Sequence, residues 1–241
     1  MEFIRASYHK INDFISFPEE DLNECSQFIL GDIEIKNLDY SYNGHDLILK
    51  NINLSIKHQE KVILEGPSGS GKSTLCKLIM RMMKYDRGEI LVNEVNLQDY
   101  DLQTIRSNIC YISQDEVLFT DTIKENILLG KSSNDLQNVI EICQIEDILK
   151  NKPFRLETFL LEQGSNLSGG EKQRIILARG LLNDCPIIIL DEALSEVSKE
   201  MEKNILLNIL RNYPDRTIIY VSHHKPTNIF DRVINLEDCY E

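Results

Sequence analysis

The sequence predicts an α/β fold built around a mainly parallel β-sheet, and three observations carry this prediction. Short apolar segments that suit buried strands alternate along the chain with longer segments of helical periodicity. A glycine-rich loop joins one of these strands directly to a helical segment, and two adjacent carboxylates follow another strand. Because helical crossovers connect parallel strands, this alternation indicates a sheet with helices packed on its faces.

The predicted strands follow from two kinds of apolar pattern. Residues 33–36 and 52–56 alternate apolar and polar side chains with period two, which is typical of half-buried strands. Short, nearly continuous apolar runs predict further strands at residues 62–64, 90–92, 110–112, 187–190 and 217–221.

The predicted helices lie between these strands. Residues 120–183 are expected to be mainly helical, with Asn134 and Asp135 capping a helix that continues through Ile145. A helix at about residues 198–212 connects the last two apolar strands and keeps its apolar side chains on one face.

The first 24 residues carry apolar side chains at rough helical spacing, up to a break at residues 17–20. This pattern predicts a short amphipathic helix that ends in a turn. Two interpretations are open: the helix packs on its own domain, or it is the end of a helix that arrives from another domain.

Composition excludes some classes of partner and site. The chain has 26 lysine and arginine residues against 39 aspartate and glutamate residues, a formal net charge of −13. A general nucleic-acid-binding protein needs a basic face, so no nucleic-acid partner is expected. The six cysteines lack the spacing of a zinc site and are predicted to be reduced thiols of a cytosolic protein. No apolar run reaches the length of about 18 residues that a membrane span requires.

A phosphate-binding loop (P-loop) is predicted between the strand at residues 62–64 and the helical segment that follows it. The loop satisfies the pattern GxxxxGK[ST] with Gly66, Pro67, Ser68, Gly69, Ser70, Gly71, Lys72 and Ser73, and Thr74 continues into the helix. Glycines let successive N–H groups turn toward an anion, and the helix N-terminus adds its positive dipole end. Lys72 is expected to reach the β- and γ-phosphates, and Ser73 to bind Mg²⁺. By itself this motif fits either an NTPase or a kinase.

Two carboxylates complete the expected phosphate chemistry. Asp191 and Glu192 directly follow the apolar strand at residues 187–190, and ligands of open α/β sheets bind at the carboxyl ends of strands. Asp191 is expected to hold Mg²⁺ through water, and Glu192 to polarise the attacking water as a general base.

Residues 167–174, with the sequence LSGGEKQR, resemble the signature segment of ATP-binding-cassette (ABC) ATPases. Ser168, Gly169 and Gly170 open a helix there, so N–H groups and a dipole end face an anion. The resemblance implies a head-to-tail homodimer, in which the P-loop of one subunit and the signature segment of the other bind the same ATP. It also implies a P-loop NTPase core with an N-terminal antiparallel β subdomain and an α-helical subdomain at about residues 115–180.

The resemblance extends to further positions in the family's order. Tyr42 resembles the aromatic residue that stacks on adenine, with Tyr40 as the competing candidate on the same strand face. Gln114 resembles the loop glutamine that senses Mg²⁺, and His223 resembles the switch histidine at the γ-phosphate. The implied catalytic residues are Glu192, His223, Lys72 and Gln114, and the implied Mg²⁺ ligands are Ser73, Gln114 and Asp191.

Two segments, residues 117–127 and 160–166, resemble the exporter branch of this family. The resemblance implies a transmembrane domain as partner, expected in the same polypeptide, and a location at the cytoplasmic face of the membrane. Residues 1–24 are then expected to be the helix tail and linker from that domain, and residues 25–241 the ATPase domain. Cassettes of bacterial peptide and bacteriocin exporters are the suggested group.

The chain departs from the family's pattern at a few positions. Ser198 stands where the family has an aspartate that bridges the dimer interface, which puts interface coupling in doubt. The turn at Asn93 and Glu94 lacks a glycine that is often found there. Three other classes are weighed: a non-transport ABC ATPase that binds nucleic acid, a P-loop kinase for small molecules, and a regulatory ATP-binding module that hydrolyses poorly.

Overall fold

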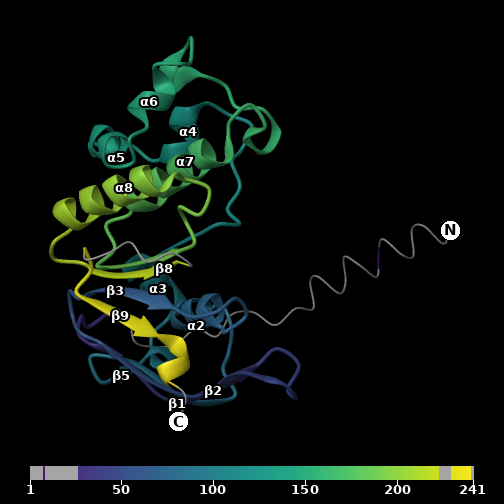
Figure 1. Ribbon diagram of the computed structural model, residues 1–241, viewed down its shortest axis with the longest axis vertical. Helices are drawn as coiled ribbons and strands as arrows, with labels where there is room; N and C mark the ends of the chain where they lie inside the picture. The colour runs from purple at the N-terminus through teal and green to yellow at the C-terminus, as the bar shows by residue number, and fades with distance from the viewer. Residues whose placement is uncertain (1–7, 9–26, 223–228, 240–241) are drawn as a thin grey trace.

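A computed structural model describes residue 8 and residues 27–222 and 229–239 of the 241-residue chain. Its centre is a five-stranded parallel sheet in the order β6-β7-β8-β3-β9 (Figure 1). These strands are β6 (Ile109–Ser113), β7 (Ile187–Asp191), β8 (Thr217–Val221), β3 (Lys61–Glu65) and β9 (Arg232–Asn235). The prediction of an α/β fold with a mainly parallel sheet is confirmed.

A second sheet, which is antiparallel, has the order β2-β1-β4-β5 and lies at the bottom of the molecule in Figure 1. Its strands are β1 (Ile33–Ser41), β2 (Leu47–Ile56), β4 (Arg87–Val92) and β5 (Val95–Asn96). The predicted antiparallel β-sheet region near the N-terminus is confirmed. Asn93 and Glu94 form the turn from β4 to β5 with φ of 49° and 65°, so two non-glycine residues adopt the left-handed conformation there.

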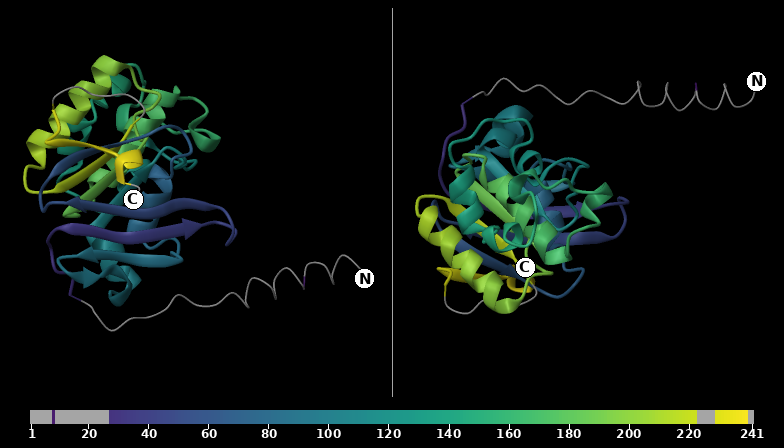
Figure 2. Two further views of the ribbon diagram at one scale, coloured as in Figure 1. Left: turned by 60° about the horizontal axis from the view of Figure 1, so that its bottom comes forward. Right: turned by 90° about the horizontal axis from the view of Figure 1, so that it is seen from above.

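Helices fill the space between the two sheets and cover the other face of the parallel sheet. Helices α2 and α3 lie between the sheets, whereas α4 to α8 lie above the parallel sheet in Figure 1, and Figure 2 shows the same layers from two other directions. The helices are α2 (Lys72–Ile79), α3 (Leu102–Asn108), α4 (Ile123–Leu128), α5 (Leu136–Ile142), α6 (Glu146–Leu149), α7 (Gly169–Leu181) and α8 (Lys199–Asn212). Short 3₁₀ turns are η1 (Leu97–Asp99), η2 (Arg155–Glu157), η3 (Glu162–Gly164) and η4 (Leu236–Cys239).

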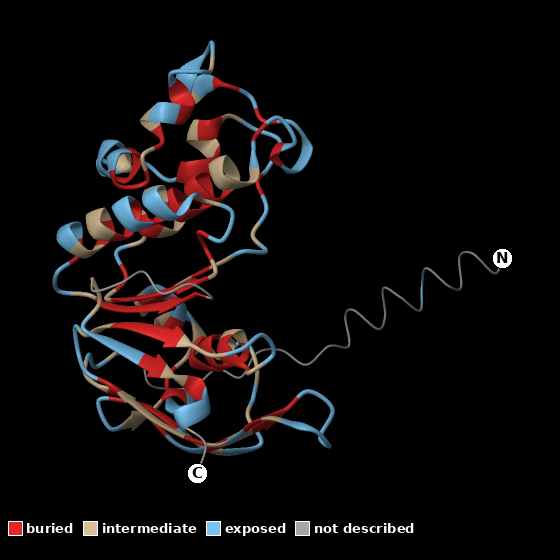
Figure 3. Ribbon diagram, in the orientation of Figure 1, coloured by how far each residue is buried: buried red, intermediate tan, exposed pale blue. Residues whose placement is uncertain are grey.

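The central strands β7 and β8 are buried at every position and β3 at its three middle positions, which Figure 3 colours red, whereas the edge strand β9 is mostly exposed. Successive side chains of a strand point to opposite faces, so β7 contributes to two cores. Ile187 and Ile189 pack with α2 and the antiparallel sheet, whereas Ile188 and Leu190 pack with the helices above. The continuous apolar run in this strand is therefore the signature of a central position in a parallel sheet.

Two expectations about helices need correction. The helix predicted to continue through Ile145 ends at Ile142, and Asp135 makes no side-chain capping bond to it. The break lies at Gln144, whose φ of 53° is left-handed and whose carbonyl accepts a hydrogen bond from Arg174 Nη1 at 2.8 Å. The region predicted as mainly helical is also interrupted between α6 and α7, where only the two 3₁₀ turns η2 and η3 occur.

The amphipathic helix predicted for residues 1–24 lies outside the described residues, apart from Tyr8. Among the residues that the structure describes, no helix combines the length and the apolar character needed to cross a membrane.

Candidate functional site

The glycine-rich loop between β3 and α2 has the backbone conformation that its sequence predicts. Gly69 and Gly71 have φ of 82° and 92°, a region that L-residues with a side chain rarely adopt. A Cβ atom on Gly71 would also lie 2.6 Å from Leu49 Cδ2 of β2. The loop therefore requires glycine at this position for both conformational and steric reasons.

Lys72, the first residue of α2, is the cation of this loop. Its side chain is buried, with 4% of its surface exposed. Its ammonium donates hydrogen bonds to the carbonyl oxygens of Gly66 at 2.8 Å and Pro67 at 2.9 Å. The positive charge is thus held inside the loop, where phosphate oxygens would compete with these carbonyls for it.

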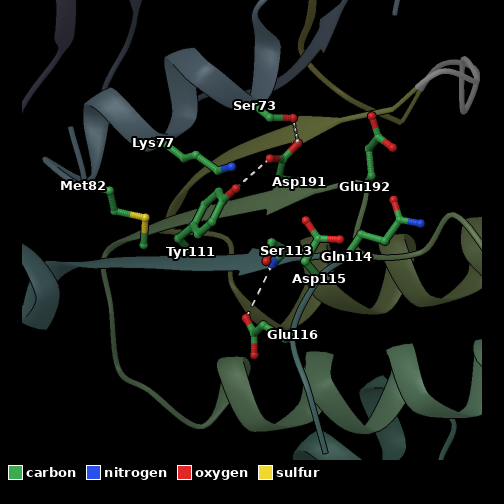
Figure 4. A pocket seen from close by; sticks show the side chains of 10 residues that line it. All are labelled: Ser73, Lys77, Met82, Tyr111, Ser113, Gln114, Asp115, Glu116, Asp191 and Glu192. Carbon is green, nitrogen blue, oxygen red and sulfur yellow. Dashed lines mark hydrogen bonds between the residues drawn. The ribbon is translucent and has the colours of Figure 1, made fainter. Parts of the chain in front are cut away.

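Asp191 lies at the carboxyl end of β7 and faces the start of α2. Its Oδ1 accepts a hydrogen bond from Ser73 Oγ at 3.0 Å, and its Oδ2 accepts one from the Tyr111 hydroxyl at 2.7 Å (Figure 4). Burial, together with the neighbouring Asp191 carboxylate, raises the pKa of Tyr111 well above its ordinary value. The phenol therefore stays protonated and keeps donating to the carboxylate.

Two adjacent pockets meet at Ser73 and Glu192, which line both. The first, of about 430 Å³, adds Asp191, Gln114 and Tyr111 to its lining. The second, of about 330 Å³, is lined on one side by the P-loop and the start of α2, through Ser68, Gly69, Gly71, Lys72 and Thr74. Tyr42 and Ile48 also line it. The structure thus brings the predicted P-loop, acidic-pair, glutamine and tyrosine positions to one place.

The two candidate tyrosines differ in exposure. Tyr42 has 59% of its surface exposed, and its hydroxyl lies 3.1 Å from Thr74 Oγ1 of α2. Tyr40 is only 6% exposed and its hydroxyl contacts the sulfur of Met83 at 3.2 Å. The rings meet edge to face with centroids 5.1 Å apart, so Tyr40 supports Tyr42 from behind. Of the two, Tyr42 is the ring open to a ligand.

Gln114 and Glu192 border the first pocket from two strand ends (Figure 4). Gln114 follows β6, and its backbone N–H donates to the Asp191 carbonyl at 3.2 Å. Glu192 follows β7, and its N–H donates to the Val221 carbonyl of β8 at 3.1 Å. The φ of Glu192 is 53°, a left-handed value that is uncommon for this residue type and that the hydrogen bond to β8 helps to hold.

The LSGGEKQR segment forms the N-terminus of α7. Ser168 is the N-cap, and it shares a capping box with Glu171: the Glu171 carboxylate accepts from Ser168 N at 2.7 Å and from Ser168 Oγ at 3.0 Å. Gly169 lies so close to the Glu196 carboxylate that a Cβ atom would be 1.7 Å from it. Ser168, Gly169 and Gly170 line neither of the two pockets, so one chain does not bring its own signature segment to its own P-loop.

Sequence reasoning missed the positioning role of two residues: Tyr111, and Gln173 within the signature segment. Tyr111 holds Asp191, and its position opposite Ile189 in the β6–β7 register places it on the same sheet face as the pocket. Gln173 of α7 donates to Ser195 Oγ at 2.8 Å and accepts from Glu196 N at 2.8 Å, which ties the signature helix to the segment after Glu192. Both contacts join segments distant in sequence, so no local pattern points to them.

Two other predicted positions have separate outcomes. His223 lies outside the described residues. Ser198, which replaces the family's aspartate, is the N-cap of α8 and accepts a hydrogen bond from Met201 N at 3.4 Å. It therefore keeps the capping role that an aspartate would have at this position.

Residues 49–195 match the ABC transporter family, over 147 of the 241 residues. The chain belongs to the ABC transporter family. This segment includes the P-loop, the signature segment and the acidic pair, and ATP-binding proteins of the family hydrolyse ATP.

Relatives and a solved structure place the chain among the ATP-binding parts of ABC exporters. It is 34% identical over 232 residues to the lactococcin-G-processing and transport ATP-binding protein LagD of Lactococcus lactis subsp. lactis, covering 93% of the chain and 33% of LagD. It is 38% identical over 213 residues to the mitochondrial iron–sulfur clusters transporter ATM1 of Candida glabrata, covering 86% of the chain and 29% of ATM1. The structure of a bacterial Atm1-family ABC exporter with ATP bound is 27% identical and covers 95% of this chain and 41% of that chain, with a TM-score of 0.88. The chain thus spans about a third of the length of these relatives.

Proposed function

We propose that this chain binds and hydrolyses ATP in a head-to-tail homodimer, and that hydrolysis powers export by an attached transmembrane domain. The observation that carries the proposal is the convergence of Lys72, Ser73, Asp191 and Glu192 on two pockets that share a wall. A phosphate-binding loop, a carboxylate for a metal and a second carboxylate at the same edge are the parts that P-loop ATPases need.

The same residues fit Mg²⁺. Ser73 Oγ and Asp191 Oδ1 are hard oxygen donors, lie 3.0 Å apart and face the pocket that Gln114 also lines. Among the described residues no group of three or more His, Cys, Asp or Glu could hold a metal ion. Mg²⁺ does not need such a group, because it binds through one or two protein ligands plus phosphates and water. When bound, it would neutralise charge on the β- and γ-phosphates.

The chain's own residues would then share the chemistry. Tyr42 stacks on adenine, and the P-loop N–H groups with Lys72 bind the phosphates. Glu192, which lines both pockets, accepts a proton from the water that attacks the γ-phosphate. Gln114 orients this water and the metal, and His223 stabilises charge in the transition state.

The dimer is proposed because Ser168 and Gly170 line neither pocket of their own chain. The N-terminus of α7 is a helix end with N–H groups that suit an anion, and the γ-phosphate bound to a partner's P-loop supplies one. A two-fold arrangement forms two such sites.

The transported substrate is proposed to be a peptide, by likeness to LagD, whose name says that it processes and transports lactococcin G. The name of ATM1 instead refers to iron–sulfur clusters, so the ATP-binding part is shared by transporters with different cargo. Residues 1–24 are proposed to link residues 25–241 to the transmembrane domain, at the cytoplasmic face of the membrane. The net charge of −13 argues against nucleic acid as a partner.

Mixing two inactive variants tests the arrangement. Lys72→Ala removes the P-loop cation and Ser168→Arg blocks the signature segment, so each homodimer should be inactive. A mixed dimer retains one intact site, so equal amounts should restore about a quarter of the wild-type rate after random pairing. If the mixture stays inactive while the wild type hydrolyses ATP, the site does not form between subunits.

The role of Glu192 has its own test. The wild-type rate per subunit should rise with protein concentration, and Glu192→Gln should abolish turnover but keep ATP binding. A Glu192→Gln variant that turns over ATP at the wild-type rate would refute its role as base.

A further inference from the structure

Helix α8 buries one carboxylate on the side that faces the parallel sheet. Glu202 is only 6% exposed, although glutamate is rarely buried unless it has a partner. Its Oε1 accepts a hydrogen bond from the hydroxyl of Tyr220 at 2.5 Å, and Tyr220 lies on β8 with 1% of its surface exposed. Helix α8 lies above β8 in Figure 1, so this bond joins the helix to the sheet beneath it. Neither residue lines the two ATP pockets, so the mechanism described above does not use this pair.

The side chain of Tyr220 is fixed at both its ring and its hydroxyl. The ring stacks on that of Phe230, with the two planes 8° apart and the centroids 5.7 Å apart. Burial, together with the Glu202 carboxylate, raises the pKa of Tyr220 well above its ordinary value. The phenol therefore keeps its proton and donates it to the carboxylate, which fixes the carboxyl-terminal part of β8 against α8.

The carboxyl end of β8 also holds the backbone of Glu192. Val221, the residue after Tyr220, accepts a hydrogen bond from Glu192 N at 3.1 Å and lies opposite Asp191 in the β7–β8 register. The φ of Glu192 is 53°, and a non-glycine residue keeps such a conformation only where its surroundings hold it. The position of the Val221 carbonyl therefore helps to determine the position of Glu192.

The start of α8 is tied to the signature helix through the loop at residues 193–198. Ser198 is the N-cap of α8, and Glu202 lies one turn further along, where its N–H donates to the Ser198 carbonyl at 2.8 Å. Within the loop, the side chain of Gln173 in α7 makes two hydrogen bonds of 2.8 Å. The buried carboxylate is therefore attached to the same loop that follows the acidic pair.

We propose that Tyr220 and Glu202 are positioning residues for Glu192, which they hold where it can act on the attacking water. This role rests on the proposed function of Glu192 as general base. Two routes fix Glu192: the loop at residues 193–198 leads from it to α8, and β8 holds its N–H, while the Tyr220–Glu202 bond joins the two routes. Loss of this bond leaves the P-loop contacts in place but lets the base shift, and a displacement of about 1 Å can reduce a rate by about a hundredfold.

Steady-state ATPase kinetics of Tyr220→Phe test the proposal. The variant keeps the ring on Phe230 and loses the bond to Glu202, so kcat should fall at least about fivefold while the KM for ATP changes by less than about twofold. Glu202→Ala should behave in the same way. Glu202→Gln is the conservative variant: its amide oxygen can still accept from the Tyr220 hydroxyl, so it should retain at least about half of the wild-type kcat.

Tyr213→Phe is the matched control, because it removes another buried hydroxyl that contacts a different element. That hydroxyl belongs to the C-cap residue of α8 and donates to the Leu181 carbonyl at 3.4 Å. Its loss should leave kcat at the wild-type value. Thermal melting of each variant, with the kinetics measured well below the lowest melting temperature, separates loss of folded protein from loss of rate.

The positioning role alone is overturned if Tyr220→Phe has the wild-type kcat while Glu192→Gln is inactive. It is also overturned if Glu202→Gln loses as much kcat as Glu202→Ala, because the hydrogen bond would then not be what holds the base. If Glu192→Gln itself turns over ATP at the wild-type rate, the proposed base is refuted and the positioning role falls with it.

Discussion

Replacing Tyr111 by phenylalanine removes one hydroxyl from the site and leaves the packing of the ring intact. That hydroxyl donates to Asp191 Oδ2 at 2.7 Å, while Ser73 Oγ holds the other carboxylate oxygen. If Ser73 turns toward a metal ion, its hydrogen bond to Asp191 is lost. Of the two side chains, only Tyr111 then still holds the Asp191 carboxylate. A hydrogen bond to a charged group contributes about 1.5–3 kcal/mol. Tyr111→Phe should therefore reduce ATP turnover by at least about tenfold, because about 1.4 kcal/mol corresponds to a factor of ten.

The assay is the ATPase rate as a function of free Mg²⁺ concentration, together with urea denaturation. We expect Tyr111→Phe to lower the maximal rate and to raise the Mg²⁺ concentration at half-maximal rate. The unfolding free energy should fall by about 1.5–3 kcal/mol, because the buried carboxylate loses a partner. Tyr85→Phe is the matched control: it removes a hydroxyl that donates to Asn96 Oδ1 at 3.3 Å in the antiparallel sheet region, so the Mg²⁺ dependence should not change.

The result that refutes this reasoning is a Tyr111→Phe variant that is less stable but has the wild-type rate and Mg²⁺ dependence. Tyr111 would then stabilise the fold without positioning Asp191. A variant with the wild-type unfolding free energy, rate and Mg²⁺ dependence would show that the hydrogen bond contributes to neither property.

Three further predictions follow from caps, glycines and a buried phenol. Ser168→Ala and Thr122→Ala each remove an N-cap hydrogen bond, of α7 and α4, and should cost about 1 kcal/mol of unfolding free energy in urea. Only Ser168→Ala should also reduce ATP turnover. Equal ATPase rates of Ser168→Ala and Thr122→Ala would contradict the role of the signature segment. Gly71→Ala should abolish ATP binding measured by calorimetry, because φ is 92° and Leu49 occupies the space that a Cβ atom would need. Gly130 also has a positive φ, of 73°, but no atom lies within 4 Å of its Cβ position. Gly130→Ala should therefore only lower the melting temperature. Burial raises the pKa of Tyr213 from 10.0 to about 12, so the unfolded state loses this proton first and the stabilisation fades as pH rises from 10 to 12. The melting temperature of the wild type should thus fall more between pH 9 and about pH 11 than that of Tyr213→Phe. If the melting temperatures of both proteins fall equally with pH, the pKa of Tyr213 is not raised.

The sequence by itself determined the features that depend on local backbone preference and on burial pattern. The segment before Asp191 is apolar at every position because both faces of β7 are buried, so its sequence alone identifies a central strand. The P-loop could also be recognised, because its glycines encode left-handed backbone and its strand and helix neighbours are adjacent in sequence. For the same reason Asp191 and Glu192 could be placed at the edge of the sheet.

The tertiary structure decided what depends on contacts between distant segments. Tyr40 and Tyr42 look equivalent in the sequence, and only packing against Met83 shows that Tyr40 is buried while Tyr42 is open. The support of Asp191 by Tyr111 joins positions 80 residues apart, and the break at Gln144 depends on a hydrogen bond from Arg174. The neighbours of a residue in the sequence determine whether it lies in a strand or a helix. Its hydrogen-bond partner and its exposure depend on the packing of the whole chain, and they decide which of the candidate residues can contact a ligand.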